Sequence, residues 1–163
     1  MRRFLAGVVF TVAAAAAAGL AVLLLGLVPV NADQRPSLLE TRALGIALRQ
    51  AVVRQAAEVE ESPAASSEDL ESGGDIYRET CARCHGEIGK PPSSAGASFY
   101  PPAPQLPQHA SEWNERELFW IIKHGIRNTA MPAWGSLLSD DDIRQVAALV
   151  KSFARERRGA PQD

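Results

Sequence analysis

The chain has 163 residues, of which 17 are basic and 19 are acidic. This length normally corresponds to one domain, and the near balance of charge argues against a nucleic-acid-binding protein, which usually carries a basic surface. The sequence shows no strand pattern, internal repeat or glycine-rich phosphate loop, so we expect an all-α protein.

The first predicted element is an apolar helix. Residues 4–28 contain no charged side chain, and about 20 apolar residues are enough to cross the hydrocarbon core of a bilayer. Arg2 and Arg3 precede this segment, which favours an N-terminus on the inner side. We predict that residues 1–32 form a transmembrane anchor or signal segment. The length favours an anchor, and cleavage at Val30-Asn31-Ala32 is the alternative.

Both interpretations carry the rest of the chain across the membrane. We therefore expect a single-pass protein of the inner (cytoplasmic) membrane, with its main domain on the periplasmic side. If the segment is cleaved, the same domain is a soluble periplasmic protein.

Residues 33–57 are predicted to form an amphipathic helical stem. Ser37 is followed three residues later by Glu40, the pattern of a capping box. Basic residues dominate the charges of the stem, and a basic helix beside a membrane span can lie on lipid headgroups, which makes membrane lipid a predicted partner. Packing on a partner subunit and a solvated spacer stay open, because the apolar positions do not form one stripe.

Residues 58–72 are acidic and rich in serine and alanine, with Val59 and Leu70 as their large apolar residues. Such a segment buries too little apolar surface to order itself, so we predict a flexible linker.

Residues 73–163 are expected to form the main domain, with three helices. The first runs over about 74–84, the second lies between Asn114 and Gly125, and the third follows Ser139, with acidic residues in its first turn. A proline-rich loop, 90–108, separates the first two helices. Three helices make a thin core for a domain of this size, and small cores usually need a staple such as a bound cofactor.

Both cysteines of the chain lie in the stretch TCARCHG, residues 80–86. On a helix, Cys81, Cys84 and His85 are spaced i, i+3 and i+4, so all three project from one face. The C-x-x-C-H pattern is typical of covalent c-type haem attachment, in which the thiols add to the haem vinyl groups and the histidine ligates the iron. We therefore predict one haem c, bound through Cys81 and Cys84, with His85 as an iron ligand.

Other roles for the two thiols fit the sequence less well. A structural zinc site needs four ligands, and His109 and His124 are too far apart for a finger. A thioredoxin-like redox pair belongs beside a βαβ pattern, which is missing here. A simple disulfide leaves the adjoining His85 without a role.

The second axial position of the iron has several candidates: His109, His124, Met131, water, or no ligand. Besides Met1, at the membrane end, Met131 is the only methionine. It lies in a loop between the second and third helices, beside Pro132, where a core methionine is not expected. We predict Met131 as the second ligand.

Residues 73–153 resemble a class I c-type cytochrome domain. The resemblance rests on Cys81-Ala82-Arg83-Cys84-His85, on Met131-Pro132 downstream, and on a final amphipathic helix from Asp140 to about Arg157. It implies an all-α fold, a small cytochrome c-like haem domain behind an N-terminal transmembrane helix and linker. The loop over 100–106 resembles the proline-containing segment that borders the haem in this family.

The resemblance also implies roles for glycines and aromatic residues. Gly74, Tyr77 and Phe153 are expected where the N- and C-terminal helices of the domain cross. Trp120 and Trp134 are expected in the haem wall, with the Trp134 indole a candidate donor to a propionate. His109 and His124 are expected at the surface or behind the haem ligands.

His/Met ligation leaves no open position on the iron, so small-molecule substrates at the iron are not expected. We predict a membrane-tethered electron carrier, or an electron-transfer subunit of a respiratory oxidoreductase, that is not itself an enzyme. Its partners are redox proteins rather than nucleic acid. The alternative function is a haem enzyme or gas sensor with a labile sixth ligand.

Overall fold

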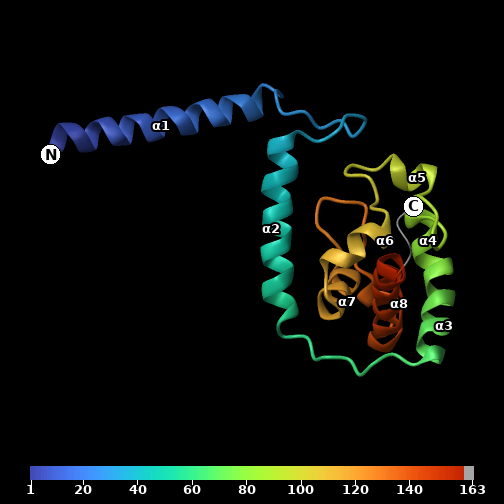
Figure 1. Cartoon of the computed structure of the whole chain (residues 1–163). Helices are drawn as coiled ribbons and strands as arrows, with labels where there is room; N and C mark the ends of the chain where they lie inside the picture. Colours follow the sequence, from blue (N-terminus) through green and yellow to red (C-terminus); the bar gives the residue numbers. More distant parts are fainter. Residues whose placement is uncertain (160–163) are drawn as a thin grey trace. The chain divides into compact units, whose positions relative to one another are not determined.

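The computed structural model describes residues 1–159, with the side chains of 108, 111 and 154–159 left out. Within this described part the chain is helical and contains no strand, which confirms the predicted all-α class (Figure 1). The chain divides into two compact units, Met1–Asn31 and a second unit that begins at Ala32.

The first unit consists of helix α1, Arg2–Leu24, and the residues that follow it. The helix is long and apolar enough to cross a membrane, and none of the residues in that stretch is buried. A signal sequence meets the same criteria of length and composition.

Helix α2, Leu38–Ala56, lies within the predicted stem, 33–57, and begins directly after Ser37. The Ser37 hydroxyl accepts a hydrogen bond from the Glu40 backbone N–H at 3.2 Å, which is one half of the predicted capping box. The Glu40 carboxylate accepts from the Tyr100 hydroxyl instead, at 2.8 Å. Because Val52 and Ala56 are buried, one side of α2 packs into the second unit, against α7, Glu115–His124.

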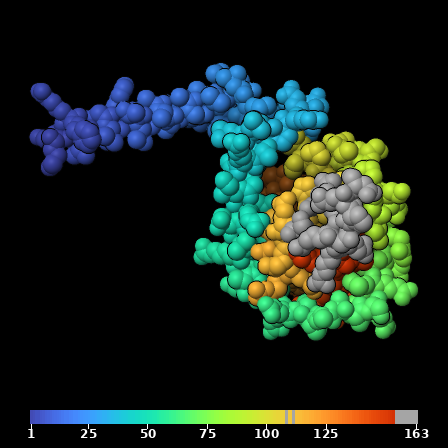
Figure 2. Space-filling view, in the orientation of Figure 1, coloured from blue at the N-terminus to red at the C-terminus, as the bar shows by residue number. Residues whose placement is uncertain are grey.

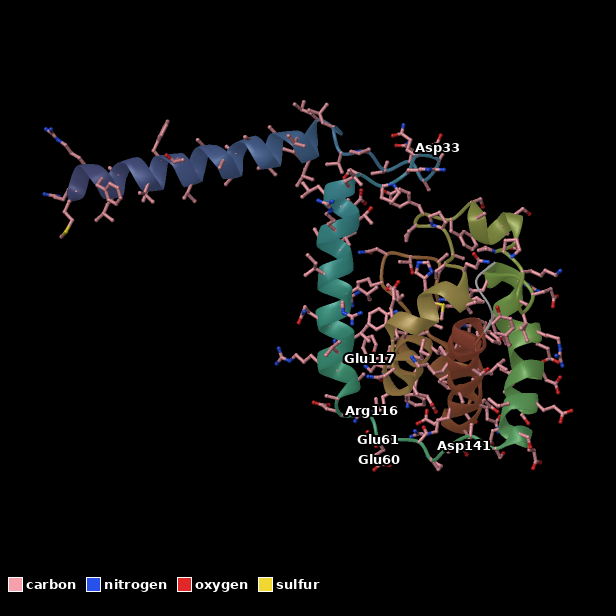
Figure 3. The ribbon with its side chains drawn as sticks, in the orientation of Figure 1. Asp33, Glu60, Glu61, Arg116, Glu117 and Asp141 are labelled. Carbon is pink, nitrogen blue, oxygen red and sulfur yellow. The ribbon has the colours of Figure 1, made fainter. Side chains whose placement is uncertain are left out.

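The segment between α2 and the next helix contacts the rest of the second unit. The Arg144 guanidinium donates to the Glu60 carbonyl and the Ser62 hydroxyl, and Arg116 lies 3.7 Å from the Glu61 carboxylate (Figure 3). Helix α3, Ser67–Ile76, starts seven residues before the helix predicted at 74. The cause is a capping box between Ser66 and Asp69, which satisfies the first backbone N–H groups.

The helix then continues without a break toward the cysteines. A π-helical turn, Tyr77–Cys81, leads into α4, Ala82–His85. Single π-helical turns are rare and often mark functional sites. Gly86, with φ of 81°, ends the run.

Three short elements lie between α4 and the second predicted helix: α5, Ser94–Ala97, α6, Leu106–His109, and a 3-10 turn, Ala110–Glu112. Helix α7 starts with a full capping box between Asn114 and Glu117 and ends at Gly125, as predicted. A further 3-10 turn, Trp134–Ser136, precedes α8, Asp140–Gly159, whose start is capped by Ser139 and Asp142.

The core lies where α3 and the π-helical turn cross α8 (Figure 1). The rings of Tyr77 and Phe153 meet edge to face there, with centroids 5.8 Å apart, as the resemblance implied. The glycine at the close approach is Gly73 rather than the expected Gly74. A Cβ on Gly73 would lie 2.5 Å from the Gln145 carbonyl oxygen, whereas one on Gly74 would meet nothing nearer than 3.7 Å.

Candidate haem site

A cavity of about 370 Å³ opens beside the cysteines, and most of its wall is apolar. All four predicted site residues line this cavity: Cys81, Cys84, His85 and Met131. They come from two parts of the chain that are far apart in sequence, and the core between α3, α7 and α8 brings them together.

The two thiols are held by the backbone around them. Both cysteines are half-buried and unpaired with each other, so the structure holds no disulfide between them. The Cys84 carbonyl accepts from the Ser93 backbone N–H at 3.2 Å, and Gly96 packs so closely on Cys84 that any Cβ there would overlap it. Burial raises the pKa of the Cys81 thiol, and the hydrogen bond with Thr80 opposes that effect.

The orientation of His85 is set by one hydrogen bond. Its Nδ1 lies 3.0 Å from the Pro104 carbonyl oxygen. A carbonyl can only accept, so Nδ1 carries the proton and Nε2 keeps a free lone pair. Burial lowers the pKa of the imidazole, which favours this neutral form. A neutral histidine whose other nitrogen is hydrogen-bonded to the backbone is the usual form of a metal ligand.

Met131 lies in a loop that folds back on itself. Its backbone N–H donates to the Thr129 hydroxyl at 3.1 Å, and its carbonyl accepts from the Ile126 N–H at 3.2 Å. Gly125, with φ of 66°, lies under the loop, where a Cβ would come within 2.6 Å of the Pro132 backbone. These contacts hold Met131 in the cavity wall.

The other predicted site residues divide into two groups. Trp134 and His109 line the cavity, as do the prolines of the 100–106 loop. Trp120 and His124 do not line it, and their rings pack against each other, with centroids 4.8 Å apart. Trp120 is therefore not part of the wall of this cavity, contrary to the expectation.

Sequence reasoning missed one part of the wall. Gly45, Leu48 and Arg49 of α2 line the cavity, although the stem was expected to lie on lipid, on a subunit or in solvent. The available signal was Gly45 itself, because a glycine inside a helix is unfavourable without a local reason.

The donor set fits a covalently bound haem. Two thiols stand one helical turn apart, an imidazole offers a free Nε2, a thioether comes from the Met131 loop, and an apolar wall suits a porphyrin. No group of three or more His, Cys, Asp or Glu side chains in the described part of the chain could hold a bare metal ion. The fold and this site together define a class I c-type cytochrome.

Comparison with known proteins supports the assignment to the c-type cytochromes. Residues 68–150 match the family described as cytochrome C oxidase, cbb3-type, subunit III. Cytochrome c6 of Bumilleriopsis filiformis is 35% identical over 90 residues, which cover 54% of this chain and 95% of that protein. Cytochrome c6 of Thermosynechococcus vestitus is 30% identical over 93 residues, 55% of this chain and 74% of that protein.

A third relative is larger. The cbb3-type cytochrome c oxidase subunit FixP of Sinorhizobium medicae is 25% identical over 118 residues, 66% of this chain and 38% of that protein. The family match spans about half of the chain, and the chain belongs to this family of c-type cytochromes. It carries covalent haem c through Cys81 and Cys84, and its function is electron transfer.

Proposed function

We propose that the chain is a one-haem electron carrier tethered to the membrane, with His85 and Met131 as the two axial ligands of the iron. The observation that carries the proposal is that both side chains line the same apolar cavity as the two cysteines. When bound, haem iron supplies a reversible one-electron couple, and methionine with histidine raises its reduction potential.

The residues of the chain hold this site in one geometry. The Pro104 carbonyl keeps the His85 ring oriented and leaves Nε2 available to bind iron. Thr129 and Gly125 support the backbone around Met131 from within the same loop. Electron transfer is fast when the ligands need not move between oxidation states, so preformed supports of this kind suit a carrier.

The apolar wall has its own effect on the site. Residues such as Leu118, Ile122 and Val150 exclude water from the cavity. A dry surrounding disfavours the extra positive charge of ferric iron, which raises the potential further. With both axial positions filled, the site binds no substrate at the iron and performs no bond-making reaction.

The proposed location follows from α1. The helix is long enough to span a bilayer, and Arg2 and Arg3 favour its N-terminus on the inner side. We propose a single span in the inner membrane with the cytochrome domain in the periplasm. The similarity to an oxidase subunit supports a redox protein of the membrane as the partner, either bound stably or met transiently.

The ligand assignment is tested on the full chain, purified in detergent from cells that attach haem c. A pyridine haemochrome assay should give one covalent haem per chain. Met131→Leu should lose the thioether-to-ferric-iron absorption band, lower the potential and allow carbon monoxide to bind. His109→Gln is the matched control, since His109 also lines the cavity, and it should keep the band.

Three results would contradict the proposal. If Met131→Leu keeps the band and the potential, methionine is not the ligand. If His109→Gln removes the native spectrum instead, the site has two histidine ligands. Carbon monoxide binding to the unmodified protein would favour the alternative function as a haem enzyme or gas sensor.

A further inference from the structure

Helix α2 lies outside the part of the chain that matches the family, residues 68–150. It nevertheless contributes Gly45, Leu48 and Arg49 to the cavity wall. Part of the cavity wall therefore comes from α2, a helix outside the residues that match the family.

The packing of α2 shows that it is built into the second unit. Val52 is fully buried and Ala56 nearly so, and Glu40 at the other end of the helix accepts from Tyr100 at 2.8 Å. Figure 2 shows the α2 residues, in teal, covering one side of the unit. The helix is thus anchored at both ends, with its middle against the cavity.

Arg49 is held over the cavity by two neighbours. Its guanidinium donates to the Glu112 carbonyl at 3.3 Å and lies 5.3 Å from the centre of the Trp113 ring. Both neighbours line the cavity themselves. Among the lining residues whose side chains the structure describes, Arg49 alone carries a permanent positive charge.

Gly45 lies one turn before Arg49 on the same helix. A Cβ at this position would meet nothing within 4 Å, so protein packing does not require a glycine. Glycine also disfavours the helix relative to alanine or leucine. The missing side chain leaves space along the cavity wall.

We propose that α2 is part of the haem site, with Arg49 pairing with a propionate carboxylate of the haem and Gly45 leaving room for the edge of the macrocycle. The inference rests on the haem site proposed above. A bound haem brings two carboxylates into this cavity, and a guanidinium is suited to pair with a carboxylate by two parallel hydrogen bonds.

The first experiment measures the reduction potential of the haem-loaded full chain. Removing a positive charge beside the haem favours ferric iron. Arg49→Gln should therefore shift the equilibrium roughly threefold toward ferric, about 28 mV at 59 mV per tenfold change. Arg49→Lys keeps the charge, so its reduction potential should stay close to that of the unmodified protein. Arg54→Gln is the control and should leave the potential unchanged, because Arg54 is exposed on the side of α2 opposite the buried Val52.

The outcomes separate this inference from the proposed function. If the unmodified chain holds no covalent haem, the proposed function fails first. If haem and native spectrum are present but Arg49→Gln and Arg54→Gln have the same potential, the role of Arg49 is overturned. If the potential of Arg49→Lys is as low as that of Arg49→Gln, Arg49 acts only by packing on Trp113. That result also overturns the proposed pairing of Arg49 with a propionate.

The second experiment uses the sign of a stability change. Gly45→Leu should lower the thermal midpoint of the haem-loaded protein by roughly 5 °C, because the new side chain overlaps the haem. Ala43→Leu, at an exposed position of the same helix, should leave the midpoint nearly unchanged. If Gly45→Leu raises the midpoint, as its helix propensity alone predicts, the haem does not reach this wall.

Discussion

Single backbone groups orient the side chains of this site. The Pro104 carbonyl decides which nitrogen of His85 is free, and Tyr77 holds the next peptide, because its hydroxyl donates to the Gly86 carbonyl at 2.9 Å. Tyr77 is buried, and burial raises the pKa of its phenol above the ordinary value. One residue therefore links the core of the domain to the end of the haem-attachment segment.

Tyr77→Phe should destabilise the protein by about 1–2 kcal/mol at neutral pH, since it leaves the buried Gly86 carbonyl without its donor. The folded protein keeps the phenol proton at a pH where the unfolded chain loses it. Stability of the unmodified protein therefore falls as pH rises above about 10, and the difference from Tyr77→Phe should shrink there. Urea unfolding at pH 7 and above pH 10 measures both effects.

Tyr100→Phe serves as the comparison, because its hydroxyl bonds to the Glu40 carboxylate outside the core. It should cost less at neutral pH than Tyr77→Phe. An equal loss in both variants would mean that the Tyr77 hydrogen bond is not the cause.

At the scale of elements, the crossing of α3 and α8 determines the position of the cysteines. The π-helical turn and α4 continue α3, so any change in how α3 packs on α8 moves Cys81 and Cys84 with it. Gly73 permits the close approach, and the Tyr77–Phe153 pair fills the space beside it. Helix packing, rather than the C-x-x-C-H segment alone, places the thiols in the cavity.

The two adjacent glycines give a matched test of this crossing. Gly73→Ala should destabilise the domain by about 1–3 kcal/mol, because its Cβ would lie 2.5 Å from the Gln145 carbonyl. Gly74→Ala has room and should stabilise the helix by up to about 1 kcal/mol. Thermal unfolding of the haem-loaded variants distinguishes the two. If Gly74→Ala loses more stability than Gly73→Ala, then Gly73 is not the residue at the close contact.

For the whole molecule, the connection between the two units determines how far the cytochrome domain can lie from α1. The predicted flexible linker, 58–72, contacts Arg144 and Arg116 and runs into α3. The two compact units divide between Asn31 and Ala32, and residues 25–37 join α1 to α2. Fully extended, these residues span at most about 45 Å, which bounds how far the cytochrome domain can move from an anchored α1.

Mass spectrometry of the protein purified from membranes tests the anchor. We expect a mass that includes residues 1–32 plus one haem, and retention in membranes washed with alkaline carbonate. A chain that begins after Ala32 and washes into the soluble fraction would show that the segment is a cleaved signal. A chain that keeps α1 but is extracted by carbonate would contradict membrane insertion.

The sequence by itself determined the local features of this protein. Haem attachment follows from the spacing of Cys81, Cys84 and His85, and the helix ends at Asn114, Gly125 and Ser139 follow from capping chemistry. Such features depend on residues within one or two turns of each other, so a single sequence suffices to find them.

Only the tertiary structure decided which distant residues meet. It selected Gly73 over Gly74, packed Trp120 on His124 and not in the cavity lining, and brought Arg49 of α2 beside Glu112 and Trp113. These outcomes depend on the rotation of each helix about its axis and on packing between segments far apart in the chain. No local pattern encodes that rotation, because it is set by the complementary surfaces of both partners at once.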